Sequence, residues 1–337
     1  MGRIIYVRTL MIMINKKHIF IAFLLLLFIT NRAFAQSGEI PVDPKVLLNV
    51  VKVETFSELI HEPVSGSGFI VSCGIKLGEL NGRAKFLVTN KHMLSDWTLA
   101  DGNISKLNKY IKIYFYSNDP NKTEPINPIE IFLQSDESNL INQKVEMHKD
   151  DLVDIAIVYL NEDLKGIKNI EVPSFDISYL CTFDFITSMY FNIGSQVFVL
   201  GYPYGITSLK NNLPIAKFGF IASTPGEIFS LKFSVPNRKG IKEIVQLTGK
   251  LLIIDGLIVP GNSGGPVILP SIIKTRINPE TQKWEHMTKP TENLVVGVLA
   301  GGFGSSGLSY SYSSDYIVET IDQFLKKRNW EPEESWP

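Results

Sequence analysis

Short apolar or alternating segments separated by turn residues recur along most of this chain, and this pattern is the strongest constraint on its fold. Alternate side chains of a β-strand face opposite sides of a sheet, so segments of this kind are typical of strands. They form two series, which predict an all-β protein of two roughly six-stranded antiparallel β-barrels. The predicted strands are residues 50–56, 68–73, 85–89, 110–116, 128–133 and 154–160, followed by 196–200, 217–222, 228–233, 251–255, 266–269 and 293–300.

The last part of the chain shows the one convincing helical period. Apolar residues recur there at three- to four-residue spacing, and Ser314 or Asp315 can cap the N-terminus. Lys326 and Lys327 lie at the other end, where positive charge suits the helix dipole. We therefore expect a C-terminal α-helix packed against the second barrel. The predicted domains are an N-terminal barrel over 36–165, an inter-barrel connection over 166–190, a C-terminal barrel over 191–313, and the helix and tail over 314–337.

Residues 1–35 have the pattern of a secretory signal peptide. Four basic residues precede the apolar run 19–29, and Ala33-Phe34-Ala35 supplies the small-x-small cleavage pattern. A retained membrane anchor is the alternative, but this run is much shorter than the roughly 20 residues that span a bilayer. We expect cleavage after Ala35, a periplasmic or extracellular location, and no stable membrane insertion after cleavage.

The composition excludes several classes of function. The 33 basic and 34 acidic residues leave a net charge of −1, so no excess positive charge is present to neutralise nucleic-acid phosphates. Two cysteines, Cys73 and Cys181, are too few for a disulfide scaffold or a structural zinc site. Two alternatives stay open for this pair, which are one disulfide bond or two separate buried thiols. The histidines show no metal-ligand spacing, and we expect no metal and no organic cofactor.

The most specific motif is the sequence PGNSGGP at residues 260–266. Glycines on both sides of Ser263 let the backbone turn tightly enough to expose the hydroxyl group, and they aim the amides of Gly261 and Ser263 at one point. Two amides that converge in this way can stabilise an oxyanion. A plain turn between strands is the alternative, but the complete motif ahead of an apolar strand favours a nucleophile.

Two further polar residues lie at strand ends. His92 follows a predicted strand, and Asp154 opens an otherwise apolar one, so its carboxylate lies at the rim of a core. Alone, such a histidine is more often a surface residue and such an aspartate a turn cap. Their occurrence in one chain with the Ser263 motif is what favours a functional interpretation of both residues. Asp150 and Asp151 lie close to Asp154 in the sequence, but we expect them to point at solvent.

The order of His92, Asp154 and Ser263 resembles the trypsin-like serine proteases, and within them most closely the bacterial HtrA/Deg branch. The resemblance extends over roughly residues 45–328 and implies the trypsin-like fold. Only nine residues follow Arg328, so we expect no PDZ domain. The segments that carry the resemblance are TNKH at 89–92, DIAI at 154–157, GNSGGP at 261–266, GSGFI at 66–70, GYPYG at 201–205, DGLIVP at 255–260 and GLSYSYSS at 307–314.

The resemblance implies a role for each residue of the site. Ser263 would attack a peptide carbonyl, His92 would accept and return the proton, and Asp154 would hold the imidazole. The amides of Gly261 and Ser263 would form the oxyanion hole. Asn262 stands where digestive relatives carry an aspartate, so activation through an ion pair with a newly cut N-terminus is not expected.

The same resemblance implies three substrate-binding residues. Leu257 would form the floor of the primary specificity pocket, where an apolar residue favours small or medium apolar side chains. Ala300 and Gly302 would lie on the strand that lines the substrate. Ala300 also replaces the serine that many relatives use to orient the aspartate.

We therefore expect an exported serine endopeptidase that cleaves a protein or peptide substrate through an acyl-enzyme on Ser263. The main alternative is a protease-fold binding protein that has lost turnover, which Ala300 and the long loop 270–292 favour. An esterase that uses the same machinery is a lesser alternative.

Overall fold

The structure is a computed structural model, and the predicted signal peptide and Leu257 lie outside the residues that it describes. One compact unit comprises residues 41–271 and 291–337. Strands β14 (Thr275–Ile277) and β15 (Trp284–His286) belong to a separate unit and pair as a small antiparallel sheet. The described residues are 43–57, 59–78, 80–104, 106–116, 128–134, 144–165, 172–188, 191–208, 211–256, 258–270, 275–277, 284–286, 293–303 and 306–333.

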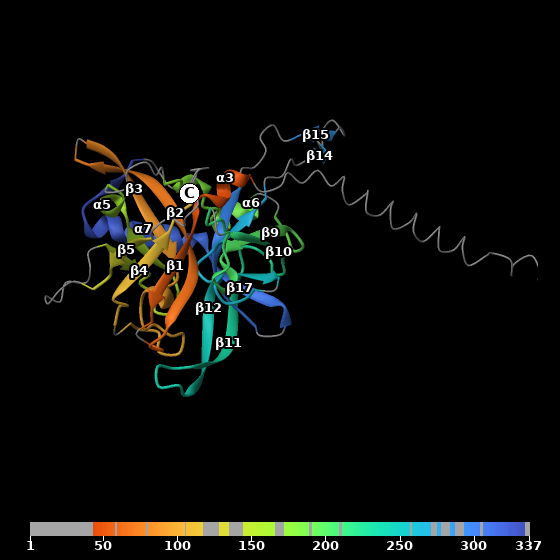
Figure 1. Cartoon of the computed structure of the whole chain (residues 1–337). Coiled ribbons are helices and arrows are strands. Elements are labelled where there is room, and N and C mark those ends of the chain that lie inside the picture. Colours follow the sequence, from red (N-terminus) through yellow and green to blue (C-terminus); the bar gives the residue numbers. More distant parts are fainter. Residues whose placement is uncertain are drawn as a thin grey trace, which may run out of the picture. The chain divides into compact units, whose positions relative to one another are not determined.

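The first half of the chain and one short strand near the C-terminus form one sheet, most of which is drawn in orange to yellow-green in Figure 1. Its strands follow the order β5-β4-β1-β2-β3-β7-β6, and β8 and β18 pair with β2. All pairs are antiparallel except the short pair of β2 and β8. These strands are β1 (Val50–Phe56), β2 (Pro63–Leu77), β3 (Leu80–Thr89), β4 (Tyr110–Tyr114), β5 (Ile129–Phe132), β6 (Val145–Met147), β7 (Ala156–Tyr159), β8 (Phe175–Asp176) and β18 (Glu331–Pro332).

The second half forms a closed antiparallel barrel. Six strands follow the order β10-β9-β13-β16-β17-β12, and a further pairing between β10 and β12 closes the ring. β11 pairs only with β12 among the described strands, so the two extend from the barrel as one long hairpin (Figure 1). These strands are β9 (Gln196–Gly201), β10 (Ile215–Ile221), β11 (Ile228–Pro236), β12 (Lys242–Asp255), β13 (Pro266–Leu269), β16 (Leu294–Gly302) and β17 (Leu308–Ser313).

The long C-terminal helix α7 (Ser314–Lys327) was predicted, but its cap is one residue earlier than expected. The Ser313 side chain, not that of Ser314 or Asp315, accepts from the Asp315 amide. Lys326 and Lys327 occupy the last turn as predicted. The other helices and turns within the described residues are short: α3 (Pro44–Leu47), α4 (Lys91–Leu94), α5 (Asn161–Leu164), η1 (Ile177–Tyr179), α6 (Phe183–Ser188) and η2 (Pro203–Gly205).

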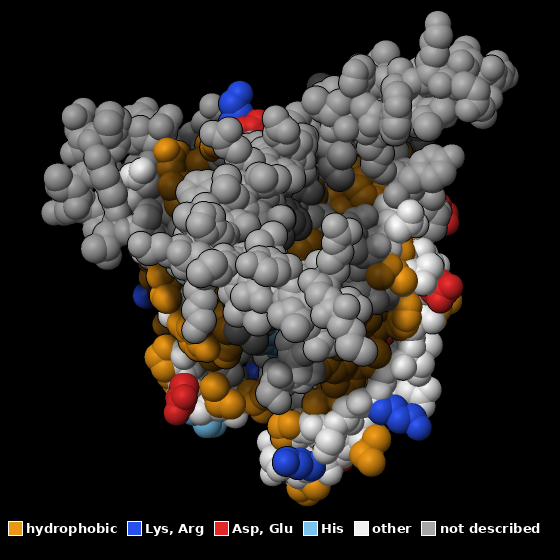
Figure 2. All heavy atoms as spheres, turned by 90° about the vertical axis from the view of Figure 1, so that its right-hand side faces the viewer, with side chains coloured by type: hydrophobic (Ala, Val, Ile, Leu, Met, Phe, Trp, Pro, Cys, Tyr) orange, Lys and Arg blue, Asp and Glu red, His pale blue; other side chains and the backbone are white. Residues whose placement is uncertain are grey.

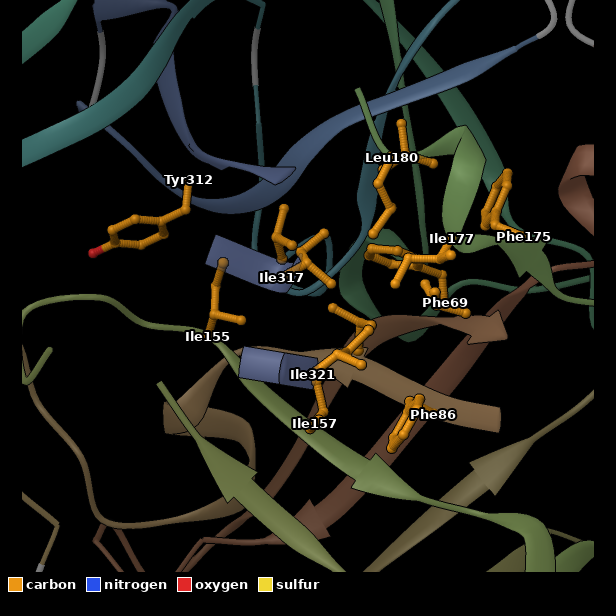
Figure 3. Packing of buried hydrophobic residues seen from close by; sticks show 14 of the residues in the cluster. Phe69, Phe86, Ile155, Ile157, Phe175, Ile177, Leu180, Tyr312, Ile317 and Ile321 are labelled. Carbon is orange, nitrogen blue, oxygen red and sulfur yellow. The ribbon is translucent and has the colours of Figure 1, made fainter. Parts of the chain in front are cut away.

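Buried apolar side chains form two clusters. One lies within the first sheet and includes Val53. The other joins the first sheet, the second barrel and α7 through residues such as Phe86, Ile157, Val298 and Ile321. Figure 3 shows Ile321 on α7 next to Ile157 of β7 and near Phe86 of β3. Because the two halves share this cluster, burial of apolar surface holds one against the other.

The structure confirms the all-β class, the two antiparallel sheets and the C-terminal helix. It adds strands that the pattern did not reveal, among them β6, β17 and the first half of β12, from Lys242 to Lys250. That half of β12 lies in the projecting hairpin, where polar residues replace the apolar ones that mark a buried strand. Cys73 and Cys181 are both buried and unbridged, so the alternative of two separate thiols is correct. In the described part of the chain, no helix has the length and apolarity to cross a membrane.

Candidate active site

β3 delivers His92 to the end of the first sheet. The strand ends at Thr89, Asn90 continues in an extended conformation, and the chain then turns into α4. Within α4 the side chains of Met93 and Leu94 are buried and anchor the turn, whereas His92 is not buried. The imidazole is 32% exposed. A buried turn thus presents one titratable ring at the surface.

Asp154 contacts the His92 ring directly. Asp154 Oδ2 is 2.6 Å from His92 Nδ1, and the His92 backbone N–H donates to Asp154 Oδ1 at 3.1 Å. Asp154 is only 4% exposed, and the Asn90 side chain donates to its carbonyl oxygen at 2.7 Å. Asp150 and Asp151 are exposed, as predicted. The two oxygens of one carboxylate therefore fix both the ring and the backbone of His92.

The contact also sets the protonation of the ring. Because Asp154 Oδ2 accepts from Nδ1, the neutral ring carries its proton there and leaves Nε2 as an acceptor. Burial disfavours the charged form of His92, but the charge and hydrogen bond of Asp154 outweigh burial, and the pKa of His92 is raised. Nε2 is therefore free to accept a proton only when the pH is above this raised pKa.

Two glycines shape the turn that carries Ser263. Gly261 has a φ of 94° and Gly264 a φ of 84°, values that favour glycine. A Cβ on Gly261 would lie 2.3 Å from Tyr202 O, and a Cβ on Gly264 would lie 2.1 Å from Ser67 O. The turn thus packs against the backbone of both η2 and β2, with no space for a larger residue at either position.

Ser67 of β2 ties the serine turn to the first sheet. Its backbone N–H donates to Ser263 O at 2.8 Å. Its Oγ donates to Gly261 O at 2.7 Å and accepts from Tyr202 N at 3.0 Å. Thr89 Oγ1, three residues before His92, donates to Ser67 O at 2.8 Å. The serine turn and the strand that delivers the histidine therefore share one buried partner, whose role the sequence did not reveal.

The amides predicted to form an oxyanion hole are available. Within the described residues, neither Gly261 N nor Ser263 N donates a hydrogen bond. The intervening amide of Asn262 and the following amide of Gly264 both donate to protein carbonyl groups. Two unengaged N–H groups on either side of an engaged one are what a developing oxyanion requires.

The Ser263 backbone and the Met93 side chain, one residue after His92, both approach Gly66 of β2. A Cβ on Gly66 would lie 2.6 Å from Met93 Sδ and 3.3 Å from Ser263 O, so the serine backbone is close to the residue after the histidine. Among the described residues, no hydrogen bond joins Ser263 Oγ to the His92 ring. Catalytic hydrogen bonds are often long before a substrate binds and tighten in the complex.

Lys91 is an unpredicted feature of the site. It is only 2% exposed, and its Nζ donates to Asp150 O at 2.8 Å. Burial lowers the pKa of Lys91, although the charges of Asp154, Asp151 and Asp150 oppose that shift. Lysines are almost never fully buried, so the sequence TNKH carries no signal for this position.

The predicted substrate-binding residues Ala300 and Gly302 both lie in β16. Ala300 is 9% exposed and Gly302 is exposed. β16 pairs with β13 no further than Val298, whereas its pairing with β17 continues to Gly302. In the described part of the chain, the β13 side of residues 300–302 therefore carries no strand. Such an edge can accept an extended peptide through backbone hydrogen bonds.

Asn262 lies in the middle of the serine turn. It is fully buried, and no described residue forms a hydrogen bond with its side-chain oxygen or nitrogen. A carboxylate at this position would be a buried charge without a partner, which is far more costly than an amide. The uncharged residue therefore suits this turn.

Charged side chains are dispersed on the face that Figure 2 shows. Few Lys, Arg, Asp and Glu side chains are visible among the described residues there, and at the upper edge a basic group lies beside an acidic one. The described residues on this face form no continuous basic patch of the kind that binds nucleic acid. No group of three or more His, Cys, Asp or Glu side chains in the described ranges could hold a metal ion.

Comparison with known proteins adds a likeness in structure. No protein-family model matches the chain, and no curated protein sequence matches it. Solved structures that match include the active form of the Rv3671c protease from M. tuberculosis, at 17% identity and a TM-score of 0.44, which covers 86% of this chain and 91% of that one. The apo MamO protease domain from Magnetospirillum magneticum matches at 15% identity and a TM-score of 0.41, covering 82% and 96%. With likenesses this distant, any proposal of function rests on the site's own geometry, which combines two antiparallel sheets with a paired histidine and aspartate.

Proposed function

We propose that this chain is a serine endopeptidase that hydrolyses peptide bonds through an acyl-enzyme on Ser263. One observation carries the proposal. The His92–Asp154 pair and a serine turn with two unengaged amides are joined through the same buried residue, Ser67. This arrangement supplies a base, a nucleophile and an oxyanion site without further groups.

The proposed chemistry follows from the proton positions. Ser263 Oγ attacks the carbonyl carbon as its proton passes to His92 Nε2, and Asp154 stabilises the imidazolium that forms. The carbonyl oxygen becomes an anion and accepts from the amides of Gly261 and Ser263. His92 then protonates the leaving amine as the C–N bond breaks. A water molecule, deprotonated by His92, hydrolyses the acyl-enzyme and returns Ser263.

The unpaired edge of β16 supports a peptide as the substrate. A strand added antiparallel to β16 would run from Gly302 towards Leu299. Leu299 O accepts from Gly264 N at 3.0 Å, so this direction leads to the serine turn. The substrate residues on the N-terminal side of the cleaved bond would therefore lie along residues 300–302 of β16. We also propose that Leu257 forms the floor of the pocket that binds the substrate side chain before the cleaved bond.

We also propose that the chain is exported, because residues 1–35 have the pattern of a signal peptide. The mature protein would then begin at Gln36 and act in the periplasm or outside the cell. N-terminal sequencing of the protein from those fractions tests this expectation. A protein that retains residues 1–35 would contradict it.

The absent hydrogen bond between Ser263 and His92 favours one rival, a protease-fold binding protein without turnover. A fluorophosphonate probe separates the two, because it reacts only with an activated serine. We expect one covalent label per chain on Ser263, abolished by Ser263→Ala and severely reduced by His92→Ala. Digestion of casein or of a peptide library then distinguishes a peptidase from an esterase. Folded protein that neither takes the label nor cleaves any peptide would refute the proposal.

A further inference from the structure

The β11–β12 hairpin has an apolar face and a polar face. Along β11 the partly buried positions are Phe229, Leu231, Phe233 and Val235, and the residues between them are exposed. Opposite them on β12, Leu247 pairs with Leu231 and is only 1% exposed. Such alternation means that one face of the hairpin packs on the protein and the other faces solvent. This holds although β11 pairs with only one described strand, β12.

A cluster of three aromatic rings lies on that apolar face. The Phe233 ring is stacked on the Phe303 ring at 5.5 Å between centroids and contacts the Tyr310 ring at 5.2 Å. The Phe303 and Tyr310 rings are 5.7 Å apart. All three side chains are partly exposed, so the cluster keeps a surface that a ligand can contact. Its members come from β11, from the residue after β16, and from β17.

The aromatic cluster lies beside the proposed peptide path. Phe303 directly follows Gly302, the end of the unpaired edge of β16. A Cβ on Gly301 would lie 3.0 Å from Tyr310 Cε1, so the Tyr310 ring packs over Gly301 on one face of β16. A peptide that passes Gly302 therefore reaches the three rings.

The tip of the hairpin is fastened to the other half of the molecule by Arg238. Its backbone N–H donates to Asp101 Oδ2 at 2.8 Å, and its Nε lies 3.2 Å from Asp96 Oδ2 and donates to Asp96 O at 3.1 Å. Its guanidinium also donates to the carbonyl and side-chain oxygens of Asn103. The planar guanidinium suits several acceptors at once in a way that an ammonium group does not.

The loop that receives Arg238 is itself joined to the catalytic pair. Trp97 Nε1 donates to Asp151 O, three residues before Asp154, at 2.9 Å. Ser95 Oγ donates to Lys91 O, next to His92, at 2.8 Å. The strands of the hairpin therefore belong to the half that carries the serine, whereas its tip contacts the loop that supports the histidine and the aspartate.

We propose that the β11–β12 hairpin is a specificity element, in which the cluster of Phe233, Phe303 and Tyr310 binds a bulky apolar side chain of the substrate, and Arg238 holds the hairpin in place. The side chain belongs to a residue about three to five positions before the cleaved bond, because the substrate runs antiparallel to β16 past Gly302. This inference rests on the proposed peptidase function. It assigns to that enzyme substrates with an aromatic or large aliphatic residue at this position.

The test uses paired fluorogenic peptides that differ only at one of these positions, with phenylalanine or leucine in one and glycine in the other. For the full-length mature protein, we expect kcat/KM to favour the bulky residue by about tenfold or more, as burial of a large apolar side chain provides. Phe233→Ala should reduce the ratio to below about threefold, and Phe233→Leu should retain most of it. Lys232→Ala, which alters the exposed face of the same strand, should leave the ratio as in the unmodified chain.

Arg238→Ala provides a second variant that keeps all three rings. Release of the tip should lower the same ratio and increase amide hydrogen exchange in residues 96–103 and 228–250. Lys239→Ala removes a neighbouring exposed positive charge whose side chain forms no hydrogen bond or ion pair with the described residues, so it should neither lower the ratio nor increase the exchange.

The outcomes separate the inference from the proposed function. An unchanged ratio in both Phe233→Ala and Arg238→Ala would overturn the inference. A protein that takes the fluorophosphonate label but shows no preference for the bulky residue would also overturn it, while the peptidase proposal stands. A protein that takes no label and cleaves neither peptide would overturn both.

Discussion

Replacement of Ser67 by alanine should weaken the fold and the oxyanion site together. Ser67 is fully buried, and its Oγ accepts from Tyr202 N and donates to Gly261 O. Without the hydroxyl, one buried N–H and one buried carbonyl lose their partner. Each unsatisfied buried group costs roughly 1–3 kcal/mol, so Ser67→Ala should lower the free energy of unfolding by roughly 2–6 kcal/mol.

Thermal unfolding and turnover measure the two effects of this substitution separately. For a protein of this size, such a loss corresponds to a fall in Tm of roughly 3–10 °C. The Gly261 peptide group, no longer held, should also align poorly with the oxyanion, and kcat should fall by up to the roughly 10²–10³ that one lost donor costs.

Ser311→Ala is the matched control for Ser67→Ala. Ser311 is also a fully buried serine on a strand, but its Oγ has no hydrogen-bond partner among the described residues. Its removal should change the free energy of unfolding by less than about 1 kcal/mol and leave kcat unaltered. If Ser67→Ala behaved like Ser311→Ala in both assays, the role given to Ser67 would be wrong. A loss of stability with normal kcat would refute its link to the oxyanion site alone.

Three further predictions concern the same architecture. Asp154→Asn removes the charge that raises the pKa of His92, so that pKa should fall and the acid limb of kcat/KM against pH should move to lower pH. Its kcat should also fall by about 10⁴, and an acid limb that stays in place would show that Asp154 does not control His92. Gly264→Ala (φ 84°) would place Cβ 2.1 Å from Ser67 O and should abolish probe labelling, whereas Gly240→Ala (φ 75°), in open space, should cost only about 1–2 kcal/mol in urea unfolding. Equal effects of these two substitutions would contradict the packing of the serine turn. Burial raises the pKa of both Cys73 and Cys181 to about 12, so neither thiol should react with a thiol reagent at pH 8 until the protein is unfolded. Fast reaction of the native protein, or a disulfide found by mass spectrometry, would refute this.

Sequence patterns predicted the parts of the fold that depend on local periodicity. The alternation in β1 and the helical spacing in α7 both come from a buried face, which leaves a repeat in the sequence. The first half of β12 left no such repeat, because Lys242, Glu243 and Gln246 are exposed in a hairpin that projects from the barrel. The α7 cap was misplaced by one residue because three serine or aspartate residues, Ser313 to Asp315, are all suitable caps.

The sequence indicated the parts of the candidate site that carry a local motif, and it gave no signal for the parts that depend on a distant residue. Glycines around Ser263 and the position of His92 after a strand are local signals. The contacts of Ser67 with Gly261 and of Arg238 with Asp96 join residues that are more than 100 positions apart. A single sequence carries no record of such pairs.

A crystal structure of the protein after reaction with a fluorophosphonate tests the central claim most directly. The account predicts a phosphorus atom bonded to Ser263 Oγ, with one phosphonyl oxygen within hydrogen-bonding distance of the amides of Gly261 and Ser263. His92 Nε2 should lie within hydrogen-bonding distance of Ser263 Oγ or of the remaining ester oxygen, with Nδ1 still held by Asp154. An unmodified Ser263, or an adduct whose oxygen faces away from both amides and from His92, would contradict it.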